Sequence, residues 1–569
     1  MKASDFIVEY LIDKGITDVF GYPGGMVTHL MDSFSKYDKE IKAHVMYHEQ
    51  GASFAACGYA QASGKVGVAY ATSGPGATNL LTGICNAYFD SIPTLFITGQ
   101  VNTYEAKGDI GVRQRGFQET DIVAMASSVT KYAVKVEDPN KIKWYLDYAF
   151  SVAQSGRKGP VLLDIPMNVF RAELDDKIMH SYSDECKKTN TNLFETIKKL
   201  EEKIRFAKRP VLLLGNGIKI AGQVEQVREL VRCCGIPTVS TMLGVDIISD
   251  RSLNYGFIGA YGDRMANFAV AKSDLVIALG ARLDVRQVGA KRENFAPNAD
   301  IIRVDIDSGE LEYKVHQNEI SICADISDVI DIIKQIITEN KIDYTEWINV
   351  CDILKEKLEN IDRRVPNCIM ERLGEMIPNN VIITTDVGQN QVWVAQSVKI
   401  KDNQRVLFSG GHGAMGYSLP AAIGCSMLSE NLVVSFNGDG GFQMNIQELQ
   451  TIVRDKLPIK IVVINNMALG MIRHFQEMYF DNNYYQTVPQ GGYTVPSFEK
   501  IAKAYGLKYM SVESEKDLDT NIFNEKEACL IEVKIKEKTY VFPKLEFGKP
   551  NEDQEPLIER SLYDYLKEL

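Results

Sequence analysis

Several features that mark specialised classes of protein are missing from this sequence. The ten cysteines stand apart, except for the pair Cys233 and Cys234, and no C-x-x-C spacing points to a structural zinc site. No apolar run approaches the roughly 20 residues of a membrane span. Asp and Glu number 75 against 63 Lys and Arg, so the basic stripe of a nucleic-acid-binding protein is not expected.

The N-terminal residues also lack the pattern of a targeting segment. Residues 1–16, MKASDFIVEYLIDKGI, have the spacing of an amphipathic helix interrupted by acidic residues, and not the apolar core of a signal peptide. Scattered single thiols suit a reducing compartment. We therefore expect a cytoplasmic protein.

What the sequence does have is a regular alternation of short apolar runs with helical patterns. This alternation is typical of parallel sheets that helices cover on both faces. At roughly 100–200 residues per domain, it predicts an α/β protein with three doubly wound parallel-sheet domains, at 1–175, 193–345 and 365–545, a polar linker at 175–192 and a C-terminal tail at 546–569. The expected strands lie at 66–72, 94–99, 160–166, 210–217, 274–280, 300–307, 381–386, 432–440, 460–466 and 528–535.

A candidate metal and phosphate site lies in the third expected domain. Asp439 follows an apolar strand and is surrounded by Gly438, Gly440 and Gly441, while Asn466 ends the next strand, 27 positions later. Neighbouring parallel strands place their carboxyl ends side by side, and ligands bind there. Carboxylate and amide oxygens suit Mg²⁺, and glycines allow close approach to a phosphate. The segment 442–453 is expected to open a helix whose N-terminus favours an anion.

A lone GDG is an ordinary turn, but its distance from the Asn-Asn pair resembles the thiamine diphosphate signature GDG-x(25–30)-NN. The resemblance extends to the acetolactate synthase (acetohydroxyacid synthase) family and covers most of the chain. It implies decarboxylation of a 2-keto acid, with pyruvate the expected donor, and carboligation of the two-carbon unit to a second carbonyl. The matching stretches are FGYPGG (20–25), YHEQGASFAACGYAQASG (47–64), TSGPGATNLLTGICNAYFDSIPTLFITGQV (72–101), GFQETDIV (116–123), DVGQNQVW (386–393), GHGAMGYSLPAAIGC (411–425) and NNMALGM (465–471).

The resemblance also implies roles for individual residues. Glu49 would exchange a proton with the pyrimidine ring of thiamine diphosphate, and Met415 would support the bent cofactor. The implied domains are an N-terminal pyrimidine-binding, a central and a C-terminal diphosphate-binding domain. Further cofactor-binding residues would be Gly388, Gln389, Asn390, Gly413, Gly438, Gly440, Gly441, Ala468 and Met471, with Asp439, Asn466 and Ala468 at the Mg²⁺ ion.

The family also carries FAD, and the central domain keeps matching stretches. Gly215 and Gly217 would allow close approach to the flavin diphosphate, and Arg282 and Arg286 would pair with its oxygens. A purely structural central domain without flavin remains the alternative.

Some positions depart from the family pattern. Met167 replaces a channel lysine, Phe475 replaces a tryptophan, and the segment 102–116 is longer and adds Arg113 and Arg115. The substrate-side positions Gly25, Phe117 and Gln118 still match. The ending resembles homologues associated with surface-polysaccharide gene clusters. A nucleotide-linked ketosugar or another carbonyl that is not a keto acid is therefore an alternative acceptor.

Other classes of function fit less well. A non-catalytic binding module is not expected to retain Glu49 together with the GDG and Asn-Asn pair. An NAD-dependent dehydrogenase needs G-x-G-x-x-G after its first strand, and GNGIKIAG (215–222) only approaches this in the second domain. The resemblance implies a homodimer or homotetramer with active sites between subunits, and it leaves a regulatory subunit open.

Overall fold

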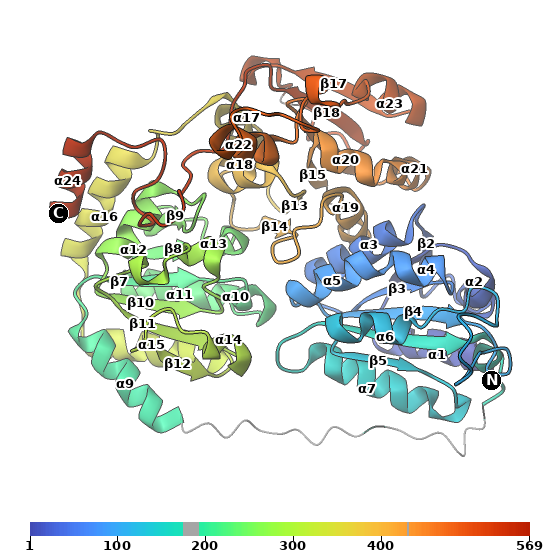
Figure 1. Ribbon diagram of the computed structural model, residues 1–569. Coiled ribbons are helices and arrows are strands. Elements are labelled where there is room, and N and C mark those ends of the chain that lie inside the picture. The colour runs from blue at the N-terminus through green and yellow to red at the C-terminus, as the bar shows by residue number, and fades with distance from the viewer. Residues whose placement is uncertain (175–181, 183–192, 429–431, 520) are drawn as a thin grey trace.

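The computed structural model describes residues 1–174, 182, 193–428, 432–519 and 521–569 (Figure 1). Within these residues three six-stranded sheets form, and every strand pair in them is parallel. The predicted α/β fold with three parallel-sheet domains is therefore confirmed. The predicted linker at 175–192 lies, apart from residue 182, outside the described residues. No helix in the described part of the chain is both long enough and apolar enough to cross a bilayer.

The first sheet has the strand order β2-β1-β3-β4-β6-β5. Its strands are β1 (Asp18–Gly21), β2 (Lys42–Val45), β3 (Gly67–Ala71), β4 (Thr94–Gln100), β5 (Tyr132–Lys135) and β6 (Pro160–Pro166). Its helices are α1 (Ala3–Asp13), α2 (Thr28–Lys36), α3 (Glu49–Ser63), α4 (Pro75–Asn79), α5 (Leu81–Phe89), α6 (Ile122–Ala126), α7 (Ile142–Gln154) and α8 (Met167–Phe170).

The central sheet has the order β12-β11-β10-β7-β8-β9. Its strands are β7 (Pro210–Leu214), β8 (Thr238–Ser240), β9 (Asn254–Phe257), β10 (Leu275–Leu279), β11 (Asp300–Asp305) and β12 (Ile320–Cys323). The helices are α9 (Leu193–Phe206), α10 (Gly217–Ile220), α11 (Val224–Cys234), α12 (Arg264–Lys272), α13 (Val285–Val288), α14 (Ser308–Glu312), α15 (Ser327–Glu339) and α16 (Thr345–Leu358).

The third sheet has the order β14-β13-β15-β16-β18-β17, which repeats the order of the first sheet strand for strand. Its strands are β13 (Ile382–Thr385), β14 (Arg405–Phe408), β15 (Val433–Gly438), β16 (Ile459–Asn465), β17 (Lys508–Val512) and β18 (Cys529–Lys534). Its helices are α17 (Val365–Met376), α18 (Gln389–Ser397), α19 (Ser418–Ser426), α20 (Asp439–Met444), α21 (Leu449–Arg454), α22 (Gly470–Tyr479) and α23 (Phe498–Tyr505).

All ten apolar runs form strands in the structure, namely β3, β4, β6, β7, β10, β11, β13, β15, β16 and β18. The strands without such a run lie at or next to the sheet edges: β1, β2, β5, β8, β9, β12, β14 and β17. Edge strands such as β2 and β5 leave most of their side chains partly exposed. They therefore need no continuous apolar run, and the sequence pattern misses them.

The helix expected to open in the segment 442–453 is interrupted in the structure. The helix α20 ends at Met444, a short 3₁₀ helix follows at Ile446–Glu448, and α21 begins at Leu449. Asn445 lies at the break, with φ −129° and ψ 30°. Its buried amide donates to the carbonyl of Gly416 at 2.7 Å, and this tertiary contact replaces helix continuation, which asparagine favours only weakly.

The first and third domains share one core. Helices α3 and α19 approach so closely that a Cβ at Gly58 would lie 2.2 Å from the carbonyl oxygen of Ala421, and one at Gly424 would lie 1.9 Å from that of Ala55. Alanines and Tyr59 of α3 belong to the same buried cluster as residues of α19 and the third sheet. The two domains therefore pack as one body (Figure 1).

The chain ends against the central domain. Leu545 donates its backbone N–H to Ala260, and Arg264 binds Asp362 at 2.6 Å and the carbonyls of Gln554 and Pro556. The tail ends in helix α24 (Arg560–Glu568), whose Tyr563 packs against Phe268 of the central domain.

Candidate active site

Each sheet has an interior point where the chain reverses its direction of travel through the strand order. These points lie between β1 and β3, between β7 and β10, and between β13 and β15. Loops leave such a pair of strands in opposite directions, so a crevice opens at their carboxyl ends and ligands bind there. Most of the candidate residues gather at these three places.

At the third sheet, Asp439 begins helix α20 directly after β15 and is 2% exposed. Its Oδ1 accepts a hydrogen bond from the Tyr493 hydroxyl at 2.9 Å, while its buried Oδ2 has no hydrogen-bond partner. Burial raises the pKa of Asp439 to about 6, against the lowering effects of the Tyr493 hydroxyl and nearby backbone amides. A buried carboxylate oxygen without a partner fits a cation ligand.

Asn466 follows the neighbouring strand β16 and points to the same crevice. Its Nδ2 donates to Oε1 of Gln389 at 2.8 Å, and its Oδ1 accepts from the backbone N–H of Ala468 at 3.2 Å. Nε2 of Gln389 is buried without an acceptor. Gly470 leaves room here, because a Cβ would lie 1.8 Å from Oε1 of Gln389. The site therefore offers a free donor as well as a free acceptor, which suits a phosphate together with its metal ion.

The loop with Met415 lies against this crevice. The methyl group of Met415 would be 3.4 Å from a Cβ at Gly440. Gly413 and Gly416 on either side have φ of 67° and 84°, in the region that favours glycine. The carboxylate of Asp386 accepts the N–H of Gly416 at 2.9 and 3.0 Å, and burial raises its pKa to about 7.

The other expected cofactor residues surround the same crevice. Asn390 donates to the carbonyl of Asp386 at 2.8 Å and lies beside Gly388 and Gly438. Gly441 packs on the Asp386 carboxylate. Ala468 is buried, and Met471 packs on the core of the domain.

At the first sheet, Glu49 is the first residue of α3 and is 8% exposed. Its Oε2 accepts from Nδ2 of Asn79 at 2.9 Å. A Cβ at Gly76 would lie 3.2 Å from its Oε1, so glycine leaves space beside this carboxylate. The side-chain partners of Glu49 and those of Asp439 thus belong to different domains.

Gln118 reaches the same crevice as Glu49. It adopts φ 61°, and a Cβ at Gly74, two residues before Gly76, would lie 2.9 Å from its Cβ. Neighbouring Phe117 is 78% exposed. Gly25 opens the turn after β1, where nothing lies within 4 Å of an added Cβ.

The remaining substrate-side candidates are more scattered. Met167 begins α8 directly after β6 of the first sheet. Phe475 lies on α22 of the third domain, 50% exposed and 4.7 Å from the ring of Tyr479. Arg113 and Arg115 lie in an exposed loop, where Nη1 of Arg115 donates to the carbonyl of Ala106 at 3.2 Å.

Two side chains of the third domain hold the Glu49 turn. Oε1 of Glu448 accepts the N–H of Tyr47 at 2.9 Å, and Nδ2 of Asn445 donates to Oε1 of Gln50 at 3.2 Å. Burial raises the pKa of Glu448 to about 7. Because Asn445 also binds Gly416, the Glu49 turn and the Met415 loop are mechanically connected within one chain.

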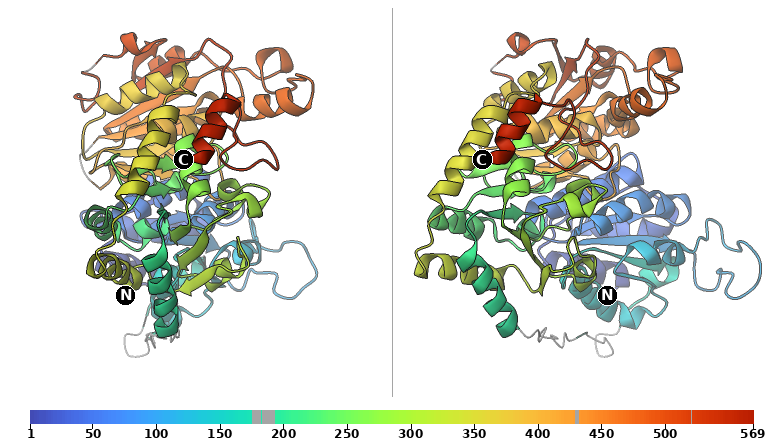
Figure 2. Two further views of the ribbon diagram at one scale, coloured as in Figure 1. Left: turned by 90° about the vertical axis from the view of Figure 1, so that its left-hand side faces the viewer. Right: turned by 60° about the vertical axis from the view of Figure 1, so that its left-hand side comes forward.

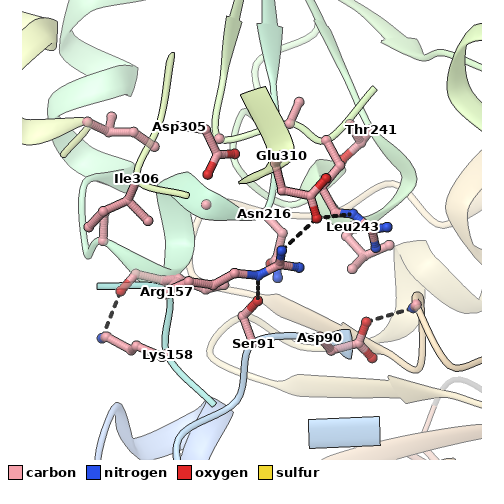
Figure 3. A pocket seen from close by; sticks show the side chains of 18 of the residues that line it. Asp90, Ser91, Arg157, Lys158, Asn216, Thr241, Leu243, Asp305, Ile306 and Glu310 are labelled. Atoms are coloured by element: carbon pink, nitrogen blue, oxygen red, sulfur yellow. Dashed lines mark hydrogen bonds and ion pairs between the residues drawn. The ribbon is translucent and has the colours of Figure 1, made fainter. Parts of the chain in front are cut away.

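At the central sheet an open cavity lies at the carboxyl ends of β7 and β10 (Figure 3). Gly217 lines it, and Gly215 packs on Gly280, where a Cβ would lie 2.0 Å from the Gly280 oxygen. Arg282 lines the cavity and binds Glu310 at 3.1 Å, whereas Arg286 is exposed on α13. Close backbone packing therefore explains Gly215 without any ligand.

Arg157 of the first domain also enters this cavity. It bonds Ser91 at 2.9 Å and Glu310 at 2.6 Å (Figure 3), and it also bonds Asp307 at 3.0 Å. Opposite, the buried Asp90 accepts the N–H groups of Gly410 and Gly411, and burial raises its pKa to about 6. All three domains thus contribute to the cavity.

Sequence reasoning missed Arg157, Asp386, Glu448 and Tyr493. Asp386 begins the matching stretch DVGQNQVW (386–393), and Glu448 lies in the segment 442–453, so their positions in the sequence were a usable signal. Arg157 and Tyr493 are brought to their sites from distant segments, and no local pattern distinguishes them.

The fold and crevices define a three-domain α/β enzyme class, and comparisons with known proteins identify it. Models of the thiamine pyrophosphate enzyme N-terminal TPP binding domain, central domain and C-terminal TPP binding domain match residues 1–125, 197–333 and 386–533. The acetolactate synthase large subunit of Lactococcus lactis is 37% identical, over 96% of this chain and 95% of the relative. The isozyme 2 large subunit of Escherichia coli is 34% identical, over 97% and 99%.

The chain belongs to the acetolactate synthase family of thiamine diphosphate enzymes. Its chemistry is therefore the thiamine diphosphate-dependent decarboxylation and carboligation of that family. The predicted family and class of enzyme are confirmed.

The paired atoms at the third sheet generate a first prediction. Asp439→Ala removes the free carboxylate oxygen, and Asn466→Ala removes the partner of Gln389. We expect both variants to lose Mg²⁺ and thiamine diphosphate together, with retention at least about tenfold weaker, because one ion would bridge protein and diphosphate. Cofactor retention is measured across a Mg²⁺ titration. Asn403→Ala, at an exposed turn, is the control, and unchanged retention in both site variants would reduce the motif to a turn.

Proposed function

We propose that the donor of this family chemistry is pyruvate and that a second pyruvate is the primary acceptor, which gives acetolactate. The observation that carries the proposal is similarity to acetolactate synthases along nearly the whole chain. The crevice residues of both outer domains support it. Thiamine diphosphate, when bound, supplies the carbon nucleophile that the amino-acid side chains lack.

The protein's own groups would bind and orient that cofactor. Asp439 and Asn466, with the backbone of Ala468, would hold Mg²⁺, and the free Nε2 of Gln389 would donate to a diphosphate oxygen. Met415 would support the rings from below, in a position that Asp386 fixes through Gly416. Glu49 would hold and release a proton at the pyrimidine N1′, with Asn79 orienting its carboxylate.

The proposed active unit is a homodimer. In one chain, Glu49 and Asp439 face different crevices, and exposed aromatic side chains lie beside both: Phe117 near Gln118, and Phe475, Tyr479 and Phe480 on and after α22. A second copy of the chain would cover these side chains and bring the pyrimidine side of one subunit to the diphosphate side of the other. Two-fold symmetry then creates two equal sites.

We also propose FAD in the central cavity. The cavity opens at the strand-order reversal of this sheet, and Arg157 and Arg282 bring positive charge into it. Asp307 and Glu310 neutralise these guanidinium groups in the structure, so a diphosphate would compete with them. Arg286 would need to turn inward from its exposed position.

A larger acceptor, such as a nucleotide-linked ketosugar, is the second candidate. The loop that carries Arg113 and Arg115 is tied to the residue next to Gln118, and guanidinium groups bind diphosphates bidentately. Met167 offers no cation to a keto-acid carboxylate, and Phe475 is smaller than the family's tryptophan.

Glu49→Gln tests the central catalytic assignment. An amide cannot exchange the proton that the carboxylate holds, so hydrogen–deuterium exchange at the cofactor C2 should slow by at least about a hundredfold, in the range of general acid–base catalysis. Nuclear magnetic resonance of the bound cofactor measures the rate. Asn79→Ala, which removes only the orienting partner, should slow it less. Exchange at the wild-type rate in Glu49→Gln would reject this role.

Reconstitution tests the flavin. Wild-type protein should bind FAD in near-stoichiometric amounts and show a visible flavin spectrum. Arg157→Ala with Arg282→Ala should weaken binding roughly tenfold or more, because charged hydrogen bonds contribute roughly 1.5–3 kcal/mol each. If saturating FAD leaves neither bound flavin nor a shift in melting temperature, the central domain is structural.

An acceptor panel separates the two candidates. Products from pyruvate alone are compared by mass spectrometry with those from pyruvate plus ketone, aldehyde and nucleotide-linked ketosugar acceptors. Arg113→Ala with Arg115→Ala should lower kcat/KM for a phosphorylated acceptor about tenfold and leave acetolactate formation unchanged. Efficient acetolactate formation and no cross-product from any other acceptor would exclude the larger acceptor.

A further inference from the structure

The carboxylate of Glu119 joins the two ends of the loop 107–116. Its Oε1 accepts the backbone N–H of Lys107 at 2.8 Å, and its Oε2 accepts those of Arg115 and Gly116 at 3.0 and 3.1 Å. The side chain of Gln114 donates to the Glu119 carbonyl at 3.1 Å. One residue thus closes the loop on itself.

The strength of this closure follows from its charge. Burial alone would raise the pKa of Glu119, but the three amides lower it below the ordinary carboxyl value. Hydrogen bonds to a charged acceptor are roughly twice as strong as neutral ones. The tip of the loop is exposed, with Ile110 58% and Val112 48% accessible, and Figure 2 shows this segment standing away from the first domain. The conformation of the loop 107–116 therefore depends on the hydrogen bonds at its base.

The base of the loop is continuous with the crevice. Glu119 is bonded in sequence to Gln118, whose left-handed backbone costs energy for a residue other than glycine and persists only where the surroundings hold it. Gly74 receives the Gln118 backbone. If the Glu119 carboxylate moves together with the three amides that it binds, the movement reaches Gln118 through the single peptide bond between Gln118 and Glu119.

The buried side chain of Gln100 holds Thr120, which directly follows Glu119. Nε2 of Gln100 donates to the carbonyl of Thr120 at 2.9 Å and to the carboxylate of Asp164 at 3.0 Å. Asp164 also accepts the Thr98 hydroxyl at 2.7 Å. Gln100 on β4 therefore holds Glu119 and Thr120 on the side of the sheet. The hydrogen bonds of the Glu119 carboxylate hold the same two residues on the side of the loop.

We propose that Glu119 is a positioning residue through which the loop 107–116 sets the place of Gln118 and thereby the acceptor that the site selects. This inference rests on the proposed function, because it assumes that Gln118 faces the carboligation site. This proposal differs from recognition of the acceptor by Arg113 and Arg115, because it requires the closed base of the loop and not the positive charges of these two side chains.

The chain offers a matched pair of variants. In Glu119→Gln the amide nitrogen must face a backbone N–H at one end of the loop, because both oxygens of Glu119 accept such groups. Glu105 closes a smaller turn of the same segment, but only its Oε2 is used, by the N–H and side-chain amide of Asn102. Glu105→Gln keeps one oxygen for that task and is the control.

Two measurements decide the question. Trypsin should cleave Glu119→Gln several times faster than wild type at Lys107, Arg113 or Arg115, and Glu105→Gln at the wild-type rate. When two acceptors from the panel compete for the two-carbon unit, Glu119→Gln should change the ratio of their products about fivefold or more relative to wild type. The KM for pyruvate should stay within about twofold of the wild-type value. Glu119→Asp, which keeps the charge but shortens the reach, should change both readouts in the same direction and by less.

An unchanged product ratio in Glu119→Gln, or cleavage no faster than in wild type, would overturn the proposal. If Glu119→Gln does not fold, the same outcomes apply to Glu119→Asp. Wild-type protein that consumes no pyruvate with thiamine diphosphate and Mg²⁺ would reject the proposed function instead, and the trypsin comparison would still show whether Glu119 closes the loop.

Discussion

The close packing of helices α3 and α19 is the constraint on which both outer crevices depend. Gly58 and Gly424 bring each helix against a backbone carbonyl of the other, and a Cβ at either glycine would overlap that carbonyl oxygen. Helix α3 begins at Glu49, and α19 begins just after the Met415 loop. The contact therefore fixes the two most important turns of one chain relative to each other, and Glu448 and Asn445 strengthen the connection.

The crevice of the third sheet is built around polar groups that the protein does not satisfy. Oδ2 of Asp439 and Nε2 of Gln389 are buried without partners, and each unsatisfied group costs about 1–3 kcal/mol. A ligand that supplies both a cation and an anionic oxygen would satisfy both groups. The buried Asp386 and the partly buried Tyr493 restrict how far these groups can relax.

The first and third domains share one strand order although no repeat is visible in the sequence. The same topology opens a crevice at the same place in both sheets, and different side chains adapt it to different tasks. Glu49 lies in the first crevice, and Asp439, Asn466 and Gln389 lie in the third. The central sheet uses its own reversal point for a larger cavity, which Arg157 of the first domain enters.

The sequence by itself determined the central strands, because strands buried on both faces require continuous apolar runs, and it determined the family, because the spacing between Asp439 and Asn466 follows two adjacent parallel strands. It did not determine the edge strands, whose side chains are partly exposed, or the break at Asn445, which a contact with Gly416 causes. Only the tertiary structure brought Tyr493 to Asp439, Arg157 to the central cavity and Glu119 to both ends of its loop. The first two contacts join segments far apart in the chain, and the third depends on how one loop folds back on itself, so no local pattern of residue types encodes them.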